Sequence, residues 1–302
     1  AKIIGCGISY DNNSQRIHFT SIYLFGVIWY NRGVKHLFGN EKNRAILRAM
    51  VSTDFKVRYQ NSALGYVWSL LKPLFIFGIL YVLFTYAFPQ GSRGITYFGV
   101  WLLIGVVLWN FFSEATMVGT RSVVENGQLI RKVAIPRHLL VIASSVSALI
   151  NLGLGMVVVV IFALLSGLMP TLLWLLLIPI IAQLFLLSIG LSLLLSALYV
   201  TFRDIAYIWE ILLQAGFYAS GIIFAIIYMP AVIQKVAFLN PVTQIIQDAR
   251  YALMPNNPAS QTIWQTFHNP LLWFIPIATT IGLFGLGWWH FQRKQRSFAE
   301  DI

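Results

Sequence analysis

The sequence has 302 residues, of which 58% are hydrophobic and only 10% are charged, whereas soluble domains carry about 25% charged residues. This composition excludes an ordinary soluble domain and predicts an all-α polytopic membrane protein whose helices face lipid or one another. The formal net charge of +11 does not indicate nucleic-acid binding, because the basic residues lie between apolar runs and not on one continuous face.

Residues 1–40 form an N-terminal extension to which we assign no role. Residues 41–64 contain Leu47, Val51 and Phe55 at intervals of four, with basic residues on the other side. This pattern predicts an amphipathic helix lying at the cytoplasmic membrane surface. An ordinary solvated helix is the alternative.

Six apolar runs within residues 65–291 are long enough to cross a bilayer, since about 20 helical residues span the hydrocarbon. They are residues 65–88, 95–118, 139–167, 172–200, 206–229 and 271–291. All are expected to be helices, because lipid offers no hydrogen-bond partner to an open strand. Lys and Arg concentrate in residues 1–64, in the second-to-third connection and in the tail, 292–302. The positive-inside rule therefore places both termini in the cytoplasm.

The first span carries Lys72 and Pro73 several residues inside its apolar part. Lys72 lies about two turns from the start of the span, given a rise of 1.5 Å per residue. Its long side chain can extend back toward the headgroups. Arg58 and Lys72 would then bracket the cytoplasmic entrance of this span.

The connection between the second and third spans predicts a short amphipathic helix, Ser122–Lys132. Leu129 and Ile130 supply apolar contacts, and Glu125, Arg131 and Lys132 supply polar ones. Such a helix, projecting from the membrane, suits docking to a cytoplasmic partner. A plain connector is the alternative.

A helical hairpin is predicted before the last span. Ala231–Leu239 reads as a short helix, and Asn240 is a candidate N-cap for a second helix with Pro241 at its first position. The second helix has an apolar face made of Val242, Ile245, Ile246, Ala249 and Leu253. We expect the hairpin to re-enter the outer leaflet, although the same periodicity suits a pair of helices packed on the surface.

Aromatic residues make up 15% of the chain. Most fit the interfacial belts of membrane proteins, but Tyr81 and Trp101 are predicted to lie deeper. We hypothesise that aromatic faces inside a passage stack against sugar rings. The candidates are Tyr81, Phe84, Trp101, Phe217, Tyr218 and Phe224.

The sequence predicts neither an enzyme nor a metal site. No G-x-x-x-x-G-K-[ST] segment appears, so ATP is not bound by that device. Cys6 is the single cysteine, and the five histidines are scattered without ligand spacing. Glu114 and Glu210 are the only acids inside the predicted spans, where structural hydrogen bonding is favoured over a proton relay.

Four segments occur in register with these spans: "YQNSALGYVWSLLKPL", "IRKVAIPRHLL", "LYVTFRDI" and "LNPVTQIIQDARYAL". Together they resemble the permease subunit of type-2 ATP-binding-cassette exporters, in the branch that exports polysaccharides and teichoic acids. The resemblance extends over about residues 41–296. It implies a pore made by two copies of the chain, with two cytoplasmic ATPase subunits that bind ATP and Mg and dock at the helices within 41–59 and 122–132.

The resemblance also implies a cargo and its sites. The cargo would be a glycan on undecaprenyl diphosphate, moved outward across the bacterial inner membrane. Arg58 and Lys72 would hold its diphosphate, and an outer gate would include Asn240, Pro241, Ile245, Ile246 and Leu253. The chain itself would need no cofactor. The glycan is expected to be an O-antigen-like polysaccharide. The alternatives are capsule or teichoic-acid export within the family, export of drugs or small lipids, ion-driven secondary transport, and a membrane scaffold.

Overall fold

The structure is a computed structural model that describes residues 40–59, 65–88, 94–132, 135–267, 274–295 and 298. The chain divides into two compact units, residues 1–46 and 47–302. Helix α2 (Asn40–Tyr59) includes the boundary between them. The predicted helix in 41–64 is therefore present, although residues 60–64 lie outside the described part. Its location at a membrane surface stays a prediction.

The second unit is built from helices, and its described residues contain no strand. Four helical segments are long and apolar enough to cross a membrane: Phe98–Glu125, His138–Leu165, Leu172–Thr201 and Phe274–Lys294. Two shorter apolar helices accompany them, Leu71–Ala87 and Ile205–Ala219. The chain is thus an all-helical, multi-pass membrane protein.

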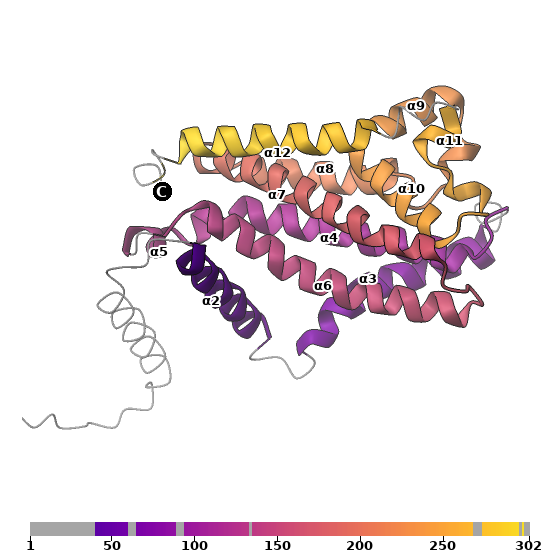
Figure 1. Ribbon diagram of the computed structural model, residues 1–302, viewed down its shortest axis with the longest axis horizontal. Coiled ribbons are helices and arrows are strands. Elements are labelled where there is room, and N and C mark those ends of the chain that lie inside the picture. The colour runs from indigo at the N-terminus through magenta and orange to yellow at the C-terminus, as the bar shows by residue number, and fades with distance from the viewer. Residues whose placement is uncertain are drawn as a thin grey trace, which may run out of the picture. The chain divides into compact units, whose positions relative to one another are not determined.

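Helix α4 (Phe98–Glu125) is the core of this unit. It packs against α6 (His138–Leu165) and α7 (Leu177–Thr201), and also contacts α3 (Gly65–Val82) and α8 (Ile205–Ala219). Its first three turns are buried on all sides, as expected of a helix that is apolar all round. On the far side of α7 lies α12 (Phe274–Lys294) (Figure 1).

The two ends of the bundle differ. Figure 1 shows α5 (Gly127–Lys132) and the last turn of α12 at one end. The other end carries α9 (Ala231–Leu239), α10 (Pro241–Leu253) and α11 (Ile263–Phe267) (Figure 1). The predicted docking helix and the predicted outer hairpin therefore lie at opposite ends, as a transmembrane arrangement requires.

Helix boundaries depart from the predictions at four places, of which three are small. The first span continues from α3 into a π-helical turn, Leu83–Ala87, and the fourth begins with a 3₁₀ turn, Leu172–Leu176. The expected separate helix from Ser122 is wrong, because α4 runs on to Glu125 and only α5 follows as a new helix. Residues 119–125 look too polar for a span, but hydroxyls such as that of Ser122 donate to carbonyls of their own helix.

The largest departure is in the fifth run. Residues 206–229 were expected to form one helix, but α8 ends at Ala219 and a 3₁₀ turn, Ile226–Tyr228, follows an irregular stretch. Gly221 has a φ of +65°, which a helix cannot contain and which glycine adopts without steric cost. The continuous apolar composition of this run concealed the break.

The hairpin helices are where the sequence placed them. Helix α9 has the predicted bounds, and the Asn240 side chain accepts a hydrogen bond from the Val242 N–H at 3.0 Å, with Pro241 in the first turn of α10. Both the N-cap and the Pro position are confirmed. The depth of the hairpin in a bilayer is not determined by these contacts and stays a prediction.

Candidate functional site

A cavity of about 1010 Å³ lies between α3, α4 and α8, with one contribution from α6. Its lining includes residues of α4 from Val106 to Val118. That stretch corresponds to about 18 Å along the helix axis at 1.5 Å per residue. The cavity therefore extends over more than half of a hydrocarbon core about 30 Å thick.

Helices α3 and α8 both run antiparallel to α4. The ring of Tyr81, near the end of α3, lies 6.2 Å from the ring of Phe98 at the start of α4. Trp209, near the start of α8, donates a hydrogen bond to the Thr116 hydroxyl near the end of α4, at 3.0 Å. Positions along the three helices can therefore be assigned to the two ends of the cavity.

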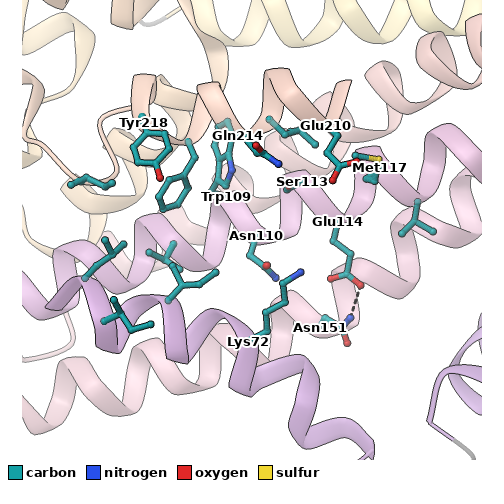
Figure 2. Close-up of a pocket in the computed structure, with 18 of the residues that line it drawn as sticks. Lys72, Trp109, Asn110, Ser113, Glu114, Met117, Asn151, Glu210, Gln214 and Tyr218 are labelled. Carbon is teal, nitrogen blue, oxygen red and sulfur yellow. Dashed lines mark hydrogen bonds between the residues drawn. The ribbon is translucent and has the colours of Figure 1, made fainter. Parts of the chain in front are cut away.

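One end of the cavity is charged. Lys72 from α3, Glu114 from α4 and Glu210 from α8 line it (Figure 2). The Glu114 carboxylate accepts a hydrogen bond from the Asn151 amide of α6 at 2.9 Å, so the structural hydrogen bonding expected of an acid within a span is observed. With one cation and two carboxylates, this end of the cavity carries a formal charge of −1.

The middle of the cavity is polar on two facing helices. Asn110 and Ser113 project from α4, and Gln214 projects from α8 (Figure 2). The Lys72 side chain extends from α3 toward Asn110 (Figure 2). Amide and hydroxyl groups both donate and accept hydrogen bonds, so this section can bind a hydroxyl-rich molecule without a net charge.

Aromatic and aliphatic side chains line the rest. The rings of Trp109 and Phe217 lie 6.3 Å apart, and those of Phe217 and Tyr218 lie 5.5 Å apart. The end away from the charges is lined by apolar residues, among them Val106 and Ile223. We name these two regions the charged end and the apolar end of the cavity.

The aromatic candidates fall into two groups. Phe217 and Tyr218 line the cavity. Phe84 instead packs against Phe98 and Phe224, with ring centroids 6.4 Å and 5.5 Å apart, and Tyr81 joins the same cluster through Phe98. Of the two residues singled out for their depth, Tyr81 is half-buried, whereas Trp101 is fully buried in the core.

Of the two cationic candidates for the diphosphate site, the structure describes the side chain of only one. Lys72 lines the cavity at its charged end. The side chain of Arg58 lies outside the described part of the chain, although its backbone belongs to α2. That the two cations bind the diphosphate together stays a prediction.

The docking candidates occupy α5 and the end of α4. Glu125, Arg131 and Lys132 are exposed, and Leu129 retains 37% of its surface. Ile130 is half-buried and packs against an apolar cluster that includes Val123, Val141, Phe291 and Phe298. Helix α5 is therefore anchored through Ile130 and presents its other side outward.

The gate candidates divide into a cap and a buried face. Asn240 caps α10, and Pro241 is partly exposed. Ile245, Ile246 and Leu253 are at most 2% exposed and belong to the core cluster formed with α4. The apolar face of α10 thus packs against the protein itself.

Arg250 is absent from the residues that the sequence predicted to be functional, but it is fully buried. A signal was present, because Arg250 follows Ile246 by four residues and so falls on the apolar face of α10. The cavity residues carried a similar signal. Asn110 and Glu114 on α4, and Glu210 and Gln214 on α8, are polar pairs four residues apart within apolar helices.

The fold and the cavity define a polytopic α-helical membrane protein with a partly polar cavity along its central helix α4. Residues 46–254 match the family model described as ABC-2 type transporter. The chain belongs to this family, whose members are membrane subunits of ATP-binding-cassette transporters.

Three curated proteins are similar to this chain in sequence. The O-antigen export system permease protein RfbA of Klebsiella pneumoniae is 28% identical over 210 residues, which cover 69% of this chain and 80% of the relative. The protein of the same name from Myxococcus xanthus is 28% identical over 183 residues, covering 60% and 68%. The polysialic acid transport protein KpsM of Escherichia coli is 24% identical over 225 residues, covering 72% and 84%.

Proposed function

We propose that this chain is the membrane-spanning subunit of an exporter that moves a lipid-linked polysaccharide out of the cytoplasm, driven by ATP hydrolysis in a separate subunit. Family membership and the names of the relatives support the class of transport and the class of cargo. The observation that carries the proposal is the cavity between α3, α4 and α8, because its lining suits a glycan.

Sugars present hydroxyl groups at the ring edges and weakly polar C–H faces. The amides of Asn110 and Gln214 and the hydroxyl of Ser113 can hydrogen-bond to such hydroxyls. The half-buried ring of Phe217 offers an apolar surface beside them, and the buried ring of Trp109 supports it at 6.3 Å. A chain of sugars can move past such a lining because no single group binds it tightly.

The diphosphate of the lipid carrier requires cations. We assign it to Lys72, with Arg58 as the second cation at the level of the inner headgroups. Glu114 and Glu210 lie closer than Lys72 to the end of α4 that carries α5, which is the cytoplasmic end in this proposal (Figure 2). Lys72 then holds the diphosphate beyond the two carboxylates, next to the polar section that the first sugars occupy.

A second copy of the chain would complete the conduit. The lining helices carry apolar side chains that remain exposed, including Trp68 at 54% and Ile79 at 67% on α3 and Tyr218 at 64% on α8. A protein surface facing them would enclose the cavity and separate a hydrophilic cargo from lipid. Two such chains would work with two ATPase subunits, docked at α5 and α2.

The topology of the proposal has six crossings in the bacterial inner membrane, with both termini in the cytoplasm. Helix α3 and its π-helical turn form the first crossing, and α8 with the segment up to Tyr228 forms the fifth. The α9–α10 hairpin then lies on the outer side as part of an outer gate. Export of capsule or teichoic acid is the alternative within the same family, and the similarity to a protein named for polysialic acid transport supports a polysaccharide other than O-antigen as a candidate class of cargo.

The experiment uses inverted membrane vesicles that contain this chain and the ATPase subunit that co-purifies with it. We expect a radiolabelled undecaprenyl-diphosphate-linked glycan to enter the vesicles only when both subunits and ATP are present. A matched control replaces the phosphate-binding lysine of the ATPase and should stop uptake. Nucleotide turnover by this chain alone, or uptake driven by an ion gradient without the ATPase, would refute the proposal.

A further inference from the structure

The fifth crossing is too short as a helix. Helix α8 has 15 residues, which reach about 22 Å, whereas the hydrocarbon is about 30 Å thick. The stretch after Ala219 must therefore cover the remaining depth without regular helical hydrogen bonds. Non-helical backbone at membrane depth is tolerated only where protein groups satisfy it.

Arg250 of α10 satisfies this stretch. Its Nη1 donates to the Gly221 carbonyl at 2.7 Å, and its Nη2 donates to the Ile222 carbonyl at 3.2 Å. Its Nε donates to the Trp101 carbonyl of α4 at 3.0 Å. One fully buried guanidinium thus joins three segments that are far apart in the sequence.

The surroundings are shaped for this side chain. The guanidinium carbon lies 3.5 Å from the centre of the Trp101 ring, and Gln247 accepts a further hydrogen bond from Nη1 at 3.1 Å. A Cβ atom at Gly105 would lie 2.6 Å from Nη2, so the space there depends on glycine. A second bond supports the same stretch, because the Asn240 amide donates to the Ser220 hydroxyl at 3.0 Å.

The stretch that Arg250 holds also forms part of the wall at the apolar end of the cavity, and we refer to this part of the wall as the closure. Ile223 follows directly after the two bonded carbonyls and lines the apolar end of the cavity. Helix α10, which carries Arg250, belongs to the hairpin at that end of the bundle (Figure 1). While these hydrogen bonds persist, any movement of α10 relative to α4 therefore also shifts Ile223.

We propose that Arg250 is a positioning residue for cargo passage, which fixes the closure at the apolar end of the cavity to α10 and α4. This inference rests on the proposed function, since it treats the cavity as the conduit. Arginine suits the role because its planar fork reaches several carbonyls at once, whereas the ammonium of lysine is a single point. Without the guanidinium, the buried carbonyls lose their hydrogen-bond donor. The closure is then held less tightly.

The test measures access to the closure from outside the cell. Ile223→Cys is introduced into the full chain with Cys6→Ser, and labelling by a membrane-impermeant maleimide is followed in intact cells expressing the whole exporter. Rates are compared per amount of monodisperse protein recovered. We expect slow labelling in this parent and at least a fivefold faster rate when Arg250→Lys is added.

Two further variants make the result decisive. Lys235→Ala removes an exposed cation from α9 of the same hairpin and should leave the rate unchanged. Ser220→Ala removes only the hydrogen bond from the Asn240 amide and should raise the labelling rate about twofold. This variant decides the outcome if Arg250→Lys does not accumulate in the membrane. An unchanged rate in correctly assembled Arg250→Lys, or in Ser220→Ala when the first variant is lost, overturns the proposal.

The labelling result is independent of transport. If wild-type vesicles take up no glycan, the proposed function fails whatever the labelling rates. If uptake is normal and the Arg250→Lys rate is unchanged, only the positioning role fails. A purely structural role would lower the recovered protein without changing the labelling rate of the recovered fraction.

Discussion

Trp101 gives the sharpest test of the difference between a packing residue and a conduit residue. Its side chain is fully buried, its Nε1 donates to the Ala259 carbonyl at 3.2 Å, and its ring faces the Arg250 guanidinium. Truncating a fully buried Trp to Ala costs about 3–5 kcal/mol. Losing the cation–π contact adds roughly 0.5–2 kcal/mol, so at least about 3.5 kcal/mol is expected in total.

That loss corresponds to a fall in melting temperature of about 10 °C, at 2–4 °C per kcal/mol for a protein of this size class. The assay is thermal unfolding of the detergent-purified chain, together with its yield as a monodisperse species. Trp68→Ala is the matched control, because Trp68 lines the cavity and is 54% exposed. It should shift the melting temperature by no more than about 2 °C while slowing glycan uptake.

The opposite pattern would refute this reasoning. If Trp101→Ala keeps the wild-type melting temperature and yield but slows glycan uptake, Trp101 acts in the conduit. The burial seen in the single chain would then describe a state that opens during transport.

Three other predictions address the docking helix, the cation and the helix packing. Leu129→Asp on α5 should abolish co-purification of the ATPase subunit while membrane insertion stays intact, and undiminished co-purification would exclude this surface. Lys72→Met should lower glycan uptake at least tenfold, and Lys72→Arg should retain most of it; equal uptake by both variants would remove Lys72 from the site. Gly287→Ala should detach α12 and lower the yield of folded protein, because the new Cβ would lie 1.9 Å from the Gly190 carbonyl oxygen. Gly282→Ala, with open space around it, should behave as wild type; similar losses in both would contradict the packing argument.

Helix positions followed closely from the sequence. Lipid forces backbone groups to bond within a segment, so each long apolar run had to be a helix, and α6 and α12 begin and end within a few residues of the predictions. Local chemistry also fixed the start of α10, because Asn240 and Pro241 need only their own neighbours to cap a helix. These features depend on interactions a few residues apart.

The functional geometry depends on contacts between distant segments. Composition could not show that α8 breaks after Ala219, because glycine, as at Gly221, and apolar residues also occur within transmembrane helices. Nor could it separate Phe217, which lines the cavity, from Trp101, which is buried, since both lie in apolar runs. Only the packing of α4 among its neighbours decides which side of each helix faces a hollow.

Arg250 shows most clearly which features follow from the sequence and which follow from tertiary contacts. The sequence by itself determined that a cation stands on the apolar face of a capped helix. The tertiary structure alone decided that its donors meet carbonyls of Trp101, Gly221 and Ile222. The physical reason is that a buried charge is tolerated only where several acceptors converge on it, and these acceptors converge only after the chain has folded.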